Sequence, residues 1–334
     1  MFKVKTPRFL QNYFLAITSI LLTLIMVEAC LRTGLIMTTI FERLKAVGAQ
    51  SASRRLVILG DSFIYKTGQL DRLLMSKLSS SNFQTLNLAV PGNGPFEYLS
   101  EFQIFGLKYK PNIILLEYYT GNDLTNVKDK MNWDVGLKAS LRPVIRSLYL
   151  YHLFNNAKLS LNDKFFNFEK IERQKINNKL LDMAQKKEIN YHLISMAVRN
   201  PNHLTDNLLM EGPSNELVWN KTKIILKKIQ SLSDSINAKL YIIVFPESLQ
   251  VSMSHVEFYK QLGFNIDPRV LDSSKPQTLL SDFCKKNNIA YLDLLPHFRQ
   301  QTSELYLEND SHLNLAGDKL AAHLIYKFLA DNIS

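Results

Sequence analysis

Short, nearly continuous apolar runs alternate along this chain with stretches in which apolar residues recur at helical spacing. The strand-like runs are residues 56–59, 85–90, 112–119, 240–245 and 290–294. The helix-like stretches are residues 70–78, 96–107, 216–237, 276–287 and 315–330. Continuous apolar strands that alternate with helices are typical of a parallel sheet covered on both faces. The pattern therefore predicts an α/β fold, a three-layer sandwich with a parallel sheet flanked by helices.

The alternation is interrupted after the third predicted strand. From about residue 124 to 237 strand signals vanish, and charged helical patterns such as residues 163–187 take over. We therefore expect a mostly helical insertion at about 124–237 within a domain that spans residues 55–334. Residues 148–154 are apolar and aromatic, which is compatible with an exposed lid and also with buried core.

The N-terminus follows a third pattern, because residues 9–27 contain no charged side chain. Lys3, Lys5 and Arg8 precede this run, and such basic flanks favour a cytoplasmic N-terminus. A helix of about 20 apolar residues can cross the hydrocarbon core of a bilayer. The sequence predicts a membrane protein with a single transmembrane helix and a main domain that is periplasmic or extracellular.

The expected boundaries follow from this pattern. They are a cytoplasmic N-terminus at residues 1–12, a transmembrane anchor or uncleaved signal at 13–32, and a connector at 33–54. A cleaved signal peptide is the alternative, since Val27-Glu28-Ala29 weakly resembles a cleavage site. Apolar residues continue beyond Arg32, and this favours a retained helix.

Charge and cysteine usage narrow the function classes. The net charge of +10 favours an anionic neighbour such as a phospholipid surface or an acidic polymer. The basic residues are spread out and no nucleic-acid-binding motif is present, so we expect no nucleic acid partner. Cys30 and Cys284 are the only cysteines, which excludes a disulfide scaffold and a cysteine metal site.

Residue types that carry chemistry follow the predicted strands. Ser62 comes after the first, Gly92 after the second and Asn122 after the third, while Asp310 and His312 precede the last helix. Sites of open parallel sheets form outside the carboxyl ends of the strands. Each residue alone has a duller explanation as a cap, a turn residue or a loop histidine. Their coincidence at equivalent positions favours one shared site.

The turn after the first strand is expected to be sharp. Gly60 allows a tight bend, and Ser62 is then expected in the first residues of the next helix. Backbone N–H groups and the positive end of a helix dipole would lie beside its hydroxyl there.

These blocks resemble those of the SGNH (GDSL-type) hydrolase superfamily. They are Gly60-Asp61-Ser62, Gly92 at the end of residues 87–92, Gly121-Asn122-Asp123, and residues 310–314. The resemblance covers about residues 54–123 and 238–330 and leaves the insertion unexplained.

Two positions depart from the common pattern of this superfamily. Phe63 replaces a leucine, and His312 follows Asp310 by two residues rather than three, with Asn309 at the commoner position. Acyltransferase-like and polysaccharide-modifying branches of the superfamily use this Asp-x-His spacing.

The resemblance implies a role for each residue. Ser62 would be the nucleophile, His312 the base and Asp310 the carboxylate that orients the histidine. The N–H groups of Ser62 and Gly92 and the side-chain amide of Asn122 would form the oxyanion hole. No metal and no cofactor are expected.

The leading hypothesis is a serine esterase that hydrolyses O-acyl esters, such as O-acetyl groups, on a cell-envelope or exported polysaccharide. Its expected partners are an acylated carbohydrate or another ester substrate, and the lipid bilayer through the N-terminal helix. An O-acyltransferase that acts on sugar hydroxyls is the first alternative. A catalytically idle SGNH scaffold in an envelope assembly and a phospholipase or lipase are further alternatives.

Overall fold

The computed structural model describes residues 8–33, 54–66, 68–131, 150, 178–186 and 188–332. The chain forms two compact units, residues 1–48 with 136–167 and residues 49–135 with 168–334.

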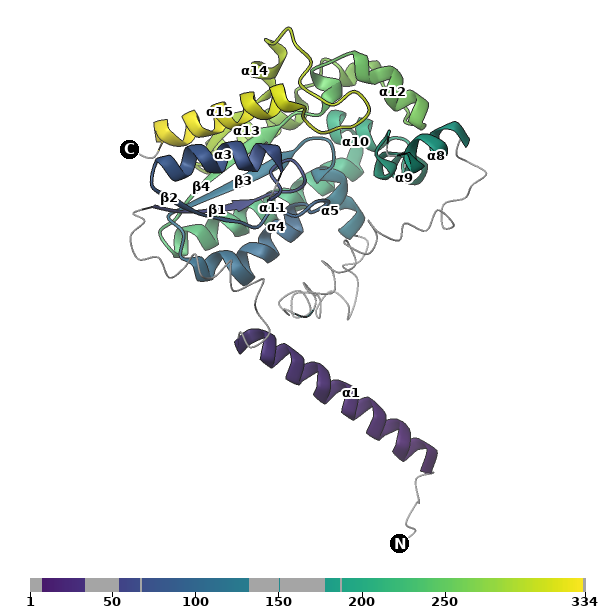
Figure 1. Ribbon diagram of the computed structural model, residues 1–334, viewed down its shortest axis with the longest axis vertical. Coiled ribbons are helices and arrows are strands. Elements are labelled where there is room, and N and C mark those ends of the chain that lie inside the picture. The colour runs from purple at the N-terminus through teal and green to yellow at the C-terminus, as the bar shows by residue number, and fades with distance from the viewer. Residues whose placement is uncertain are drawn as a thin grey trace. The chain divides into compact units, whose positions relative to one another are not determined.

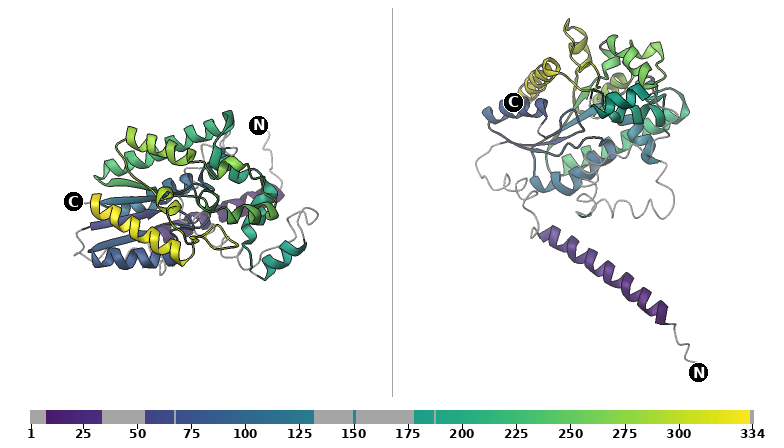
Figure 2. Two further views of the ribbon diagram at one scale, coloured as in Figure 1. Left: turned by 90° about the horizontal axis from the view of Figure 1, so that it is seen from above. Right: turned by 45° about the vertical axis from the view of Figure 1, so that its right-hand side comes forward.

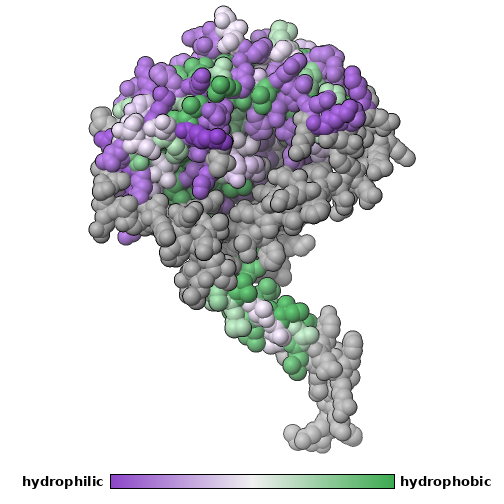
Figure 3. Space-filling model, in the orientation of Figure 1, coloured by the Kyte–Doolittle hydropathy of each residue, from purple (hydrophilic) through white to green (hydrophobic). Residues whose placement is uncertain are grey.

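The first unit contains one long helix, α1 (Arg8–Thr33). Large apolar side chains such as Leu15, Ile20 and Met26 are exposed along it, as the green atoms of the helix in Figure 3 show. Among the helices whose side chains the structure describes, none is long and apolar enough to span a membrane. The membrane anchor at residues 13–32 stays a prediction.

The second unit is built on a sheet of five parallel strands, as expected (Figure 1). The strands are β1 (Arg54–Leu59), β2 (Phe83–Asn87), β3 (Ile113–Tyr119), β4 (Lys239–Phe245) and β5 (Ala290–Asp293). Their order is β2-β1-β3-β4-β5. Leu59 pairs with Leu116, and Tyr119 pairs with Phe245, so the three central strands end near one another at one edge.

Helices cover both faces of this sheet (Figures 1 and 2). On one face α3 (Gln69–Ser80) and α15 (Leu315–Asn332) pack against each other, over a core that includes Leu56, Leu115 and Ile243. On the other face lie α4 (Pro95–Glu101) and α11 (Gly212–Ser235), while α13 (Lys275–Lys286) packs against β5. The predicted three-layer arrangement is confirmed.

Two predicted elements are placed differently. β2 ends at Asn87 rather than at residue 90. The Ala89 N–H donates to the Asn87 side chain there, while the Val90 N–H still donates to Gly60 O at the end of β1. The helix predicted over residues 96–107 changes its winding, with α4 followed by the π-helical η2 (Phe102–Gly106) and the 3₁₀ turn η3 (Leu107–Tyr109).

The described part of the insertion is helical. It comprises α5 (Asp123–Met131), α8 (Asn178–Gln185), α9 (Tyr191–Arg199), α10 (His203–Leu209) and α11. Residues 132–149 and 151–177 lie outside the described residues, and with them most of the apolar stretch at 148–154 and much of the helical pattern at 163–187.

Helices α8, α9 and α10 of the insertion share a second core with α12 (Ser254–Leu262), a helix that the sequence pattern did not reveal. Leu193, Leu208 and Tyr259 are buried members of this core. The turns η6 (Ser248–Gln250) and η7 (Pro268–Val270) flank α12, and the short α14 (Leu295–Arg299) follows β5. This core brings the start of α9 toward the loop that precedes α15.

Candidate active site

The turn after β1 places Ser62 at the edge of the sheet. Gly60 begins this turn, where a Cβ atom would lie only 2.5 Å from the Glu117 carboxylate oxygen Oε2. Asp61 Oδ1 then accepts the Phe63 N–H at 3.0 Å, which tightens the bend around Ser62. The side chain of Ser62 is half-buried.

The expectation that Ser62 opens the next helix is wrong. Helix α3 begins only at Gln69, with Gly68 in the cap position, and a turn closed by Gly68 N–H and Tyr65 O precedes it. The bend made by Asp61 directs the chain away from the helix before it can start. Ser62 therefore has no helix N-terminus of its own beside it.

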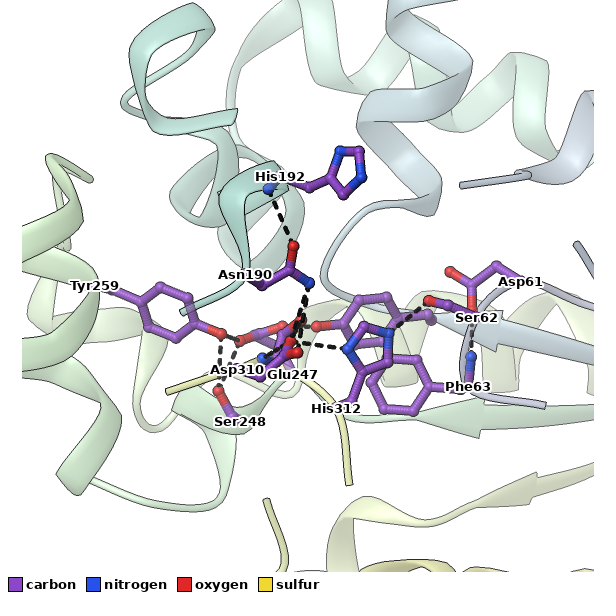
Figure 4. A network of polar contacts seen from close by, with 12 residues as sticks. Asp61, Ser62, Phe63, Asn190, His192, Glu247, Ser248, Tyr259, Asp310 and His312 are labelled. Atoms are coloured by element: carbon purple, nitrogen blue, oxygen red, sulfur yellow. Dashed lines mark hydrogen bonds and ion pairs between the residues drawn. The ribbon is translucent and has the colours of Figure 1, made fainter. Parts of the chain in front are cut away.

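Ser62, His312 and Asp310 form one line of hydrogen bonds, drawn in Figure 4. His312 Nε2 lies 2.8 Å from Ser62 Oγ, and His312 Nδ1 lies 2.8 Å from Asp310 Oδ1. Both distances are those of good hydrogen bonds. The structure thus brings together three residues that are up to 250 positions apart in the sequence.

A short antiparallel loop holds the histidine and the carboxylate. Leu307 N–H donates to His312 O at 2.9 Å, and Tyr306 pairs with Leu313. Asn314 caps α15, because its Oδ1 accepts the N–H groups of Ala316 and Gly317. Asp310 is therefore not the cap of the last helix and is available to His312.

The charges of this line reinforce one another. Burial lowers the pKa of His312, but the hydrogen bond and charge of Asp310, with the charges of Asp61 and Glu247, outweigh burial and raise it. Burial raises the pKa of Asp310, and the bond and charge of His312 reverse this and lower it. The site is arranged to stabilise an imidazolium next to an ionised aspartate.

The three expected oxyanion donors lie on neighbouring turns. The Val90 N–H donates to Gly60 O at 3.2 Å and so places the turn of Gly92 beside that of Ser62. Gly92 has a φ of 75°, which favours glycine. Within the described part of the chain, the N–H groups of Ser62 and Gly92 have no acceptor.

Asn122 lies between β3 and α5, and its side chain is fixed by the first turn. Its Nδ2 donates to Asp61 Oδ2 at 3.0 Å. Its Oδ1 is buried and has no hydrogen-bond partner among the described residues. One N–H of the Asn122 amide is thus bound to Asp61, and the other is available to a ligand.

Sequence reasoning missed two polar residues next to this line, both visible in Figure 4. Asn190 Nδ2 lies 3.4 Å from each oxygen of the Asp310 carboxylate. Glu247 is fully buried and accepts hydrogen bonds from Tyr259 at 2.7 Å, from Ser248 and from Tyr119. Glu247 follows the predicted strand at 240–245 and was open to the same argument as Ser62, whereas nothing in the sequence links Asn190 to the site.

Among the described residues, no group of three or more His, Cys, Asp or Glu side chains is arranged to hold a metal. His255 is buried, and its ring packs near those of Phe258, Tyr259 and Tyr306.

Comparison with known proteins gives only distant likenesses. No protein-family model and no curated protein matches the chain. A putative acylhydrolase from Bacteroides fragilis has 10% identity and a TM-score of 0.43, over 89% of this chain and 98% of its own.

Two further solved structures are similar to a comparable degree. The lipase/acylhydrolase from Enterococcus faecalis has 11% identity and a TM-score of 0.42, over 83% of this chain and 96% of its own. A catalytic mutant of an acetylxylan esterase from Geobacillus stearothermophilus has 8% identity and a TM-score of 0.44, over 83% of this chain and 94% of its own. At these identities and TM-scores the likenesses carry no argument about what this chain does.

Proposed function

We propose that this protein is a serine esterase of the SGNH (GDSL-type) kind that hydrolyses O-acyl esters. The observation that carries the proposal is the continuous hydrogen-bonded line from Ser62 Oγ through the His312 ring to Asp310, with 2.8 Å at both links. A hydroxyl, a base and an orienting carboxylate in this order are the parts of a nucleophilic serine.

The proposed reaction proceeds in two halves. His312 Nε2 takes the proton of Ser62 Oγ as that oxygen attacks the acyl carbonyl, and then gives the proton to the leaving alkoxide. Water attacks the acyl-serine in the second half, with His312 again as base, and releases the acid and free Ser62. Asp310 holds the proton on Nδ1, so that Nε2 is free to accept, and stabilises the imidazolium.

The negative charge of the tetrahedral intermediate needs donors on the turns around Ser62. In the proposal these are the N–H groups of Ser62 and Gly92 and the free N–H of the Asn122 amide. Loss of one such donor typically costs about 10²–10³ in kcat.

The proposed substrate is an O-acyl group, such as an O-acetyl ester, on a cell-envelope or exported polysaccharide. Two observations support this choice. The Asp310-Ser311-His312 spacing resembles that of the acyltransferase-like and polysaccharide-modifying branches of the superfamily. The charge-free run at residues 9–27 would place the domain beyond the membrane. The exposed apolar side chains of α1 favour a lipid-facing role for that helix.

Hydrolysis of p-nitrophenyl acetate by the full chain tests the proposed chemistry. We expect Ser62→Ala to reduce the rate to the uncatalysed background. Ser80→Ala is the matched control, because Ser80 is exposed at the end of α3 and its loss leaves the site intact. Unchanged hydrolysis by Ser62→Ala, with the fold verified by circular dichroism, contradicts the proposal and favours the idle scaffold.

Transfer of the acyl group to a sugar is the second candidate activity. The same acyl-serine would serve, and the acceptor hydroxyl would take the place of water. Incubation of the enzyme with an activated acetyl ester, with and without an oligosaccharide, distinguishes the two. An excess of acetylated sugar over free acetate would replace the esterase by an acyltransferase.

A further inference from the structure

Three acidic side chains are buried together beneath the serine turn. Asp61, Glu117 and Asp123 are each inaccessible to solvent. Burial raises the pKa of all three, and their mutual repulsion adds to the rise at Glu117 and Asp123. Such a cluster is costly unless its members are satisfied by hydrogen bonds, so its retention calls for a role.

Asp61 is the member of this cluster that accepts hydrogen bonds from the serine turn and from Asn122. Its Oδ1 accepts the Phe63 N–H at 3.0 Å, and its Oδ2 accepts Asn122 Nδ2 at 3.0 Å. Burial raises the pKa of Asp61, and these bonds offset only part of that rise. The charge of Asp61 adds to the rise in the pKa of Glu117. Burial raises the pKa of both carboxyls, and that of Glu117 well above its ordinary value.

Glu117 also fixes the backbone of the turn. Its Oε2 accepts the Asp61 N–H at 2.7 Å, a contact that the missing side chain of Gly60 makes possible. The position of the Asp61 carboxylate is thus set from both sides, by the backbone bond and by the Phe63 N–H.

The orientation of the Asn122 amide depends on this carboxylate. The oxygen and nitrogen ends of an amide have nearly the same shape, so packing does not choose between its two orientations. The described neighbours of Asn122 Oδ1 offer it no donor. In the reversed orientation Oδ1 would face Asp61 Oδ2 across 3.0 Å, with two acceptors opposed.

We propose that Asp61 is a positioning residue of the esterase: its carboxylate holds one N–H of Asn122 and so presents the other to the oxyanion. The inference rests on the proposed function, since it assumes that Asn122 is an oxyanion donor. It assigns to the middle residue of Gly60-Asp61-Ser62 a role that neither capping nor nucleophilic attack supplies.

The proposal makes an unusual prediction for two variants. In Asp61→Asn the new side chain has a single acceptor oxygen, and the Phe63 N–H needs that oxygen as its acceptor. The NH₂ of the new side chain then faces Asn122. The Asn122 amide reverses and presents Oδ1 to the oxyanion, and we expect kcat to fall on the order of 10²-fold with KM little changed. Asp61→Ala adds no donor and leaves the amide free to rotate, so it should lose about tenfold or less.

A merely structural role predicts the opposite order. Asn is close in shape to Asp, whereas Ala leaves a cavity and an unpaired Phe63 N–H, so stability should suffer more in Asp61→Ala. Thermal unfolding of both variants gives the structural cost separately from kcat. The positioning role therefore predicts that Asp61→Asn is more stable than Asp61→Ala but less active.

A double-mutant cycle with Asn122→Ala closes the test. We expect Asp61→Asn to cost about 10²-fold in kcat when Asn122 is present and less than about twofold in the Asn122→Ala background. Asp123→Asn is the matched control, because Asp123 accepts from the Tyr98 hydroxyl and the Tyr119 N–H rather than from the Asn122 side chain. Its effect on kcat should be the same in both backgrounds.

The outcomes separate this inference from the proposed function. Absence of esterase activity, or activity that survives Ser62→Ala, overturns the proposed function itself. If activity depends on Ser62, the esterase stands. The role of Asp61 is then overturned by either of two results: Asp61→Asn reduces kcat equally in both backgrounds, or Asp61→Ala is less active than Asp61→Asn.

Discussion

At the scale of single residues, the site combines a histidine that is easy to protonate with carboxylates that are hard to ionise. His312 gains a proton readily because Asp310, Asp61 and Glu247 outweigh its burial. The pKa values of Glu117 and Asp123, which lie in the same region, are raised by burial and by the charge of Asp61. Each group leads to a separate pH dependence.

The activity should follow the state of His312. Only the neutral ring accepts the proton of Ser62, and the pKa of His312 lies above its ordinary 6.5. We expect kcat/KM to rise with pH through an apparent pKa above 6.5. Asp310→Asn should lower that apparent pKa and reduce kcat on the order of 10³- to 10⁴-fold. A pH–rate profile with the same midpoint in both proteins would show that Asp310 does not act on the histidine.

The pH dependence of the free energy of unfolding should reflect the raised pKa of Glu117. Its pKa is raised in the folded state, so between about pH 4.5 and that raised pKa the folded chain holds a proton that the unfolded chain has lost. Stability contributed by this proton is complete at low pH and is lost as pH rises through the window. We expect Glu117→Gln, which has no proton to lose, to show a smaller fall in Tm between pH 5 and pH 9. Parallel Tm curves for the two proteins would contradict the assignment.

At the scale of elements, the insertion reaches the site through the capping residue that precedes helix α9. Asn190 caps α9, because its Oδ1 accepts the His192 N–H at 3.0 Å, and the same side chain directs its NH₂ to Asp310. One residue thus ties the helical insertion to the carboxylate of the proposed triad. The 3.4 Å distances are long for a hydrogen bond, so the effect on Asp310 is modest.

Two replacements of Asn190 separate its two contacts. Asn190→Ser keeps an N-cap and loses the donor, so Tm should stay near that of the wild type while kcat falls several-fold. Asn190→Asp keeps the cap and places a second negative charge beside Asp310, which should raise the apparent pKa of His312 further. Measurement of Tm and of the pH–rate profile decides the matter, and identical profiles in all three proteins would exclude coupling between α9 and the site.

The elements that the sequence predicts best are those defined by burial. β1, β3 and β4 match their apolar runs within two residues, because both faces of a covered parallel strand must be apolar. The helix predicted over residues 70–78 matches α3 within two residues. Ser62 does not lie in its first turn, because the bend after Gly60 depends on the Asp61 side chain, which no periodicity reveals. The sequence pattern does not predict α12, because its nine residues pack against helices of the insertion rather than against the sheet.

The site was predictable to the same extent. Residues at strand ends, such as Ser62 and Asn122, follow from topology, and the structure does place them together. The contacts of Asn190 and Glu117 do not follow, since the first depends on how the insertion folds back and the second lies within a strand whose apolar pattern hides it.

At the scale of the whole molecule, the chain joins a sheet domain to an apolar helix with basic residues before it. Lys3, Lys5 and Arg8 precede the charge-free run, and the net charge of the chain is +10. Basic residues beside an apolar run would favour an anionic membrane surface. We propose a retained anchor, which gives a definite expectation for the full chain.

The anchored form should remain in the membrane when peripheral proteins are washed away. We expect the full chain to stay in the pellet after extraction of membranes with alkaline carbonate. We also expect its intact mass to equal the mass calculated for the uncleaved sequence. Appearance in the soluble fraction, with a mass that corresponds to cleavage near Ala29, would replace the anchor by a signal peptide.

The central claim is that Ser62 attacks an acyl carbonyl with His312 as its base. Covalent labelling with a fluorophosphonate, followed by peptide mass mapping, tests this most directly, because the reagent reports the activated serine without any knowledge of the natural substrate. The account predicts a single phosphonyl adduct on Ser62 that is absent from Ser62→Ala and strongly slowed in His312→Ala. An unlabelled Ser62 under conditions that label a control serine esterase, or an equal labelling rate in His312→Ala, would contradict it.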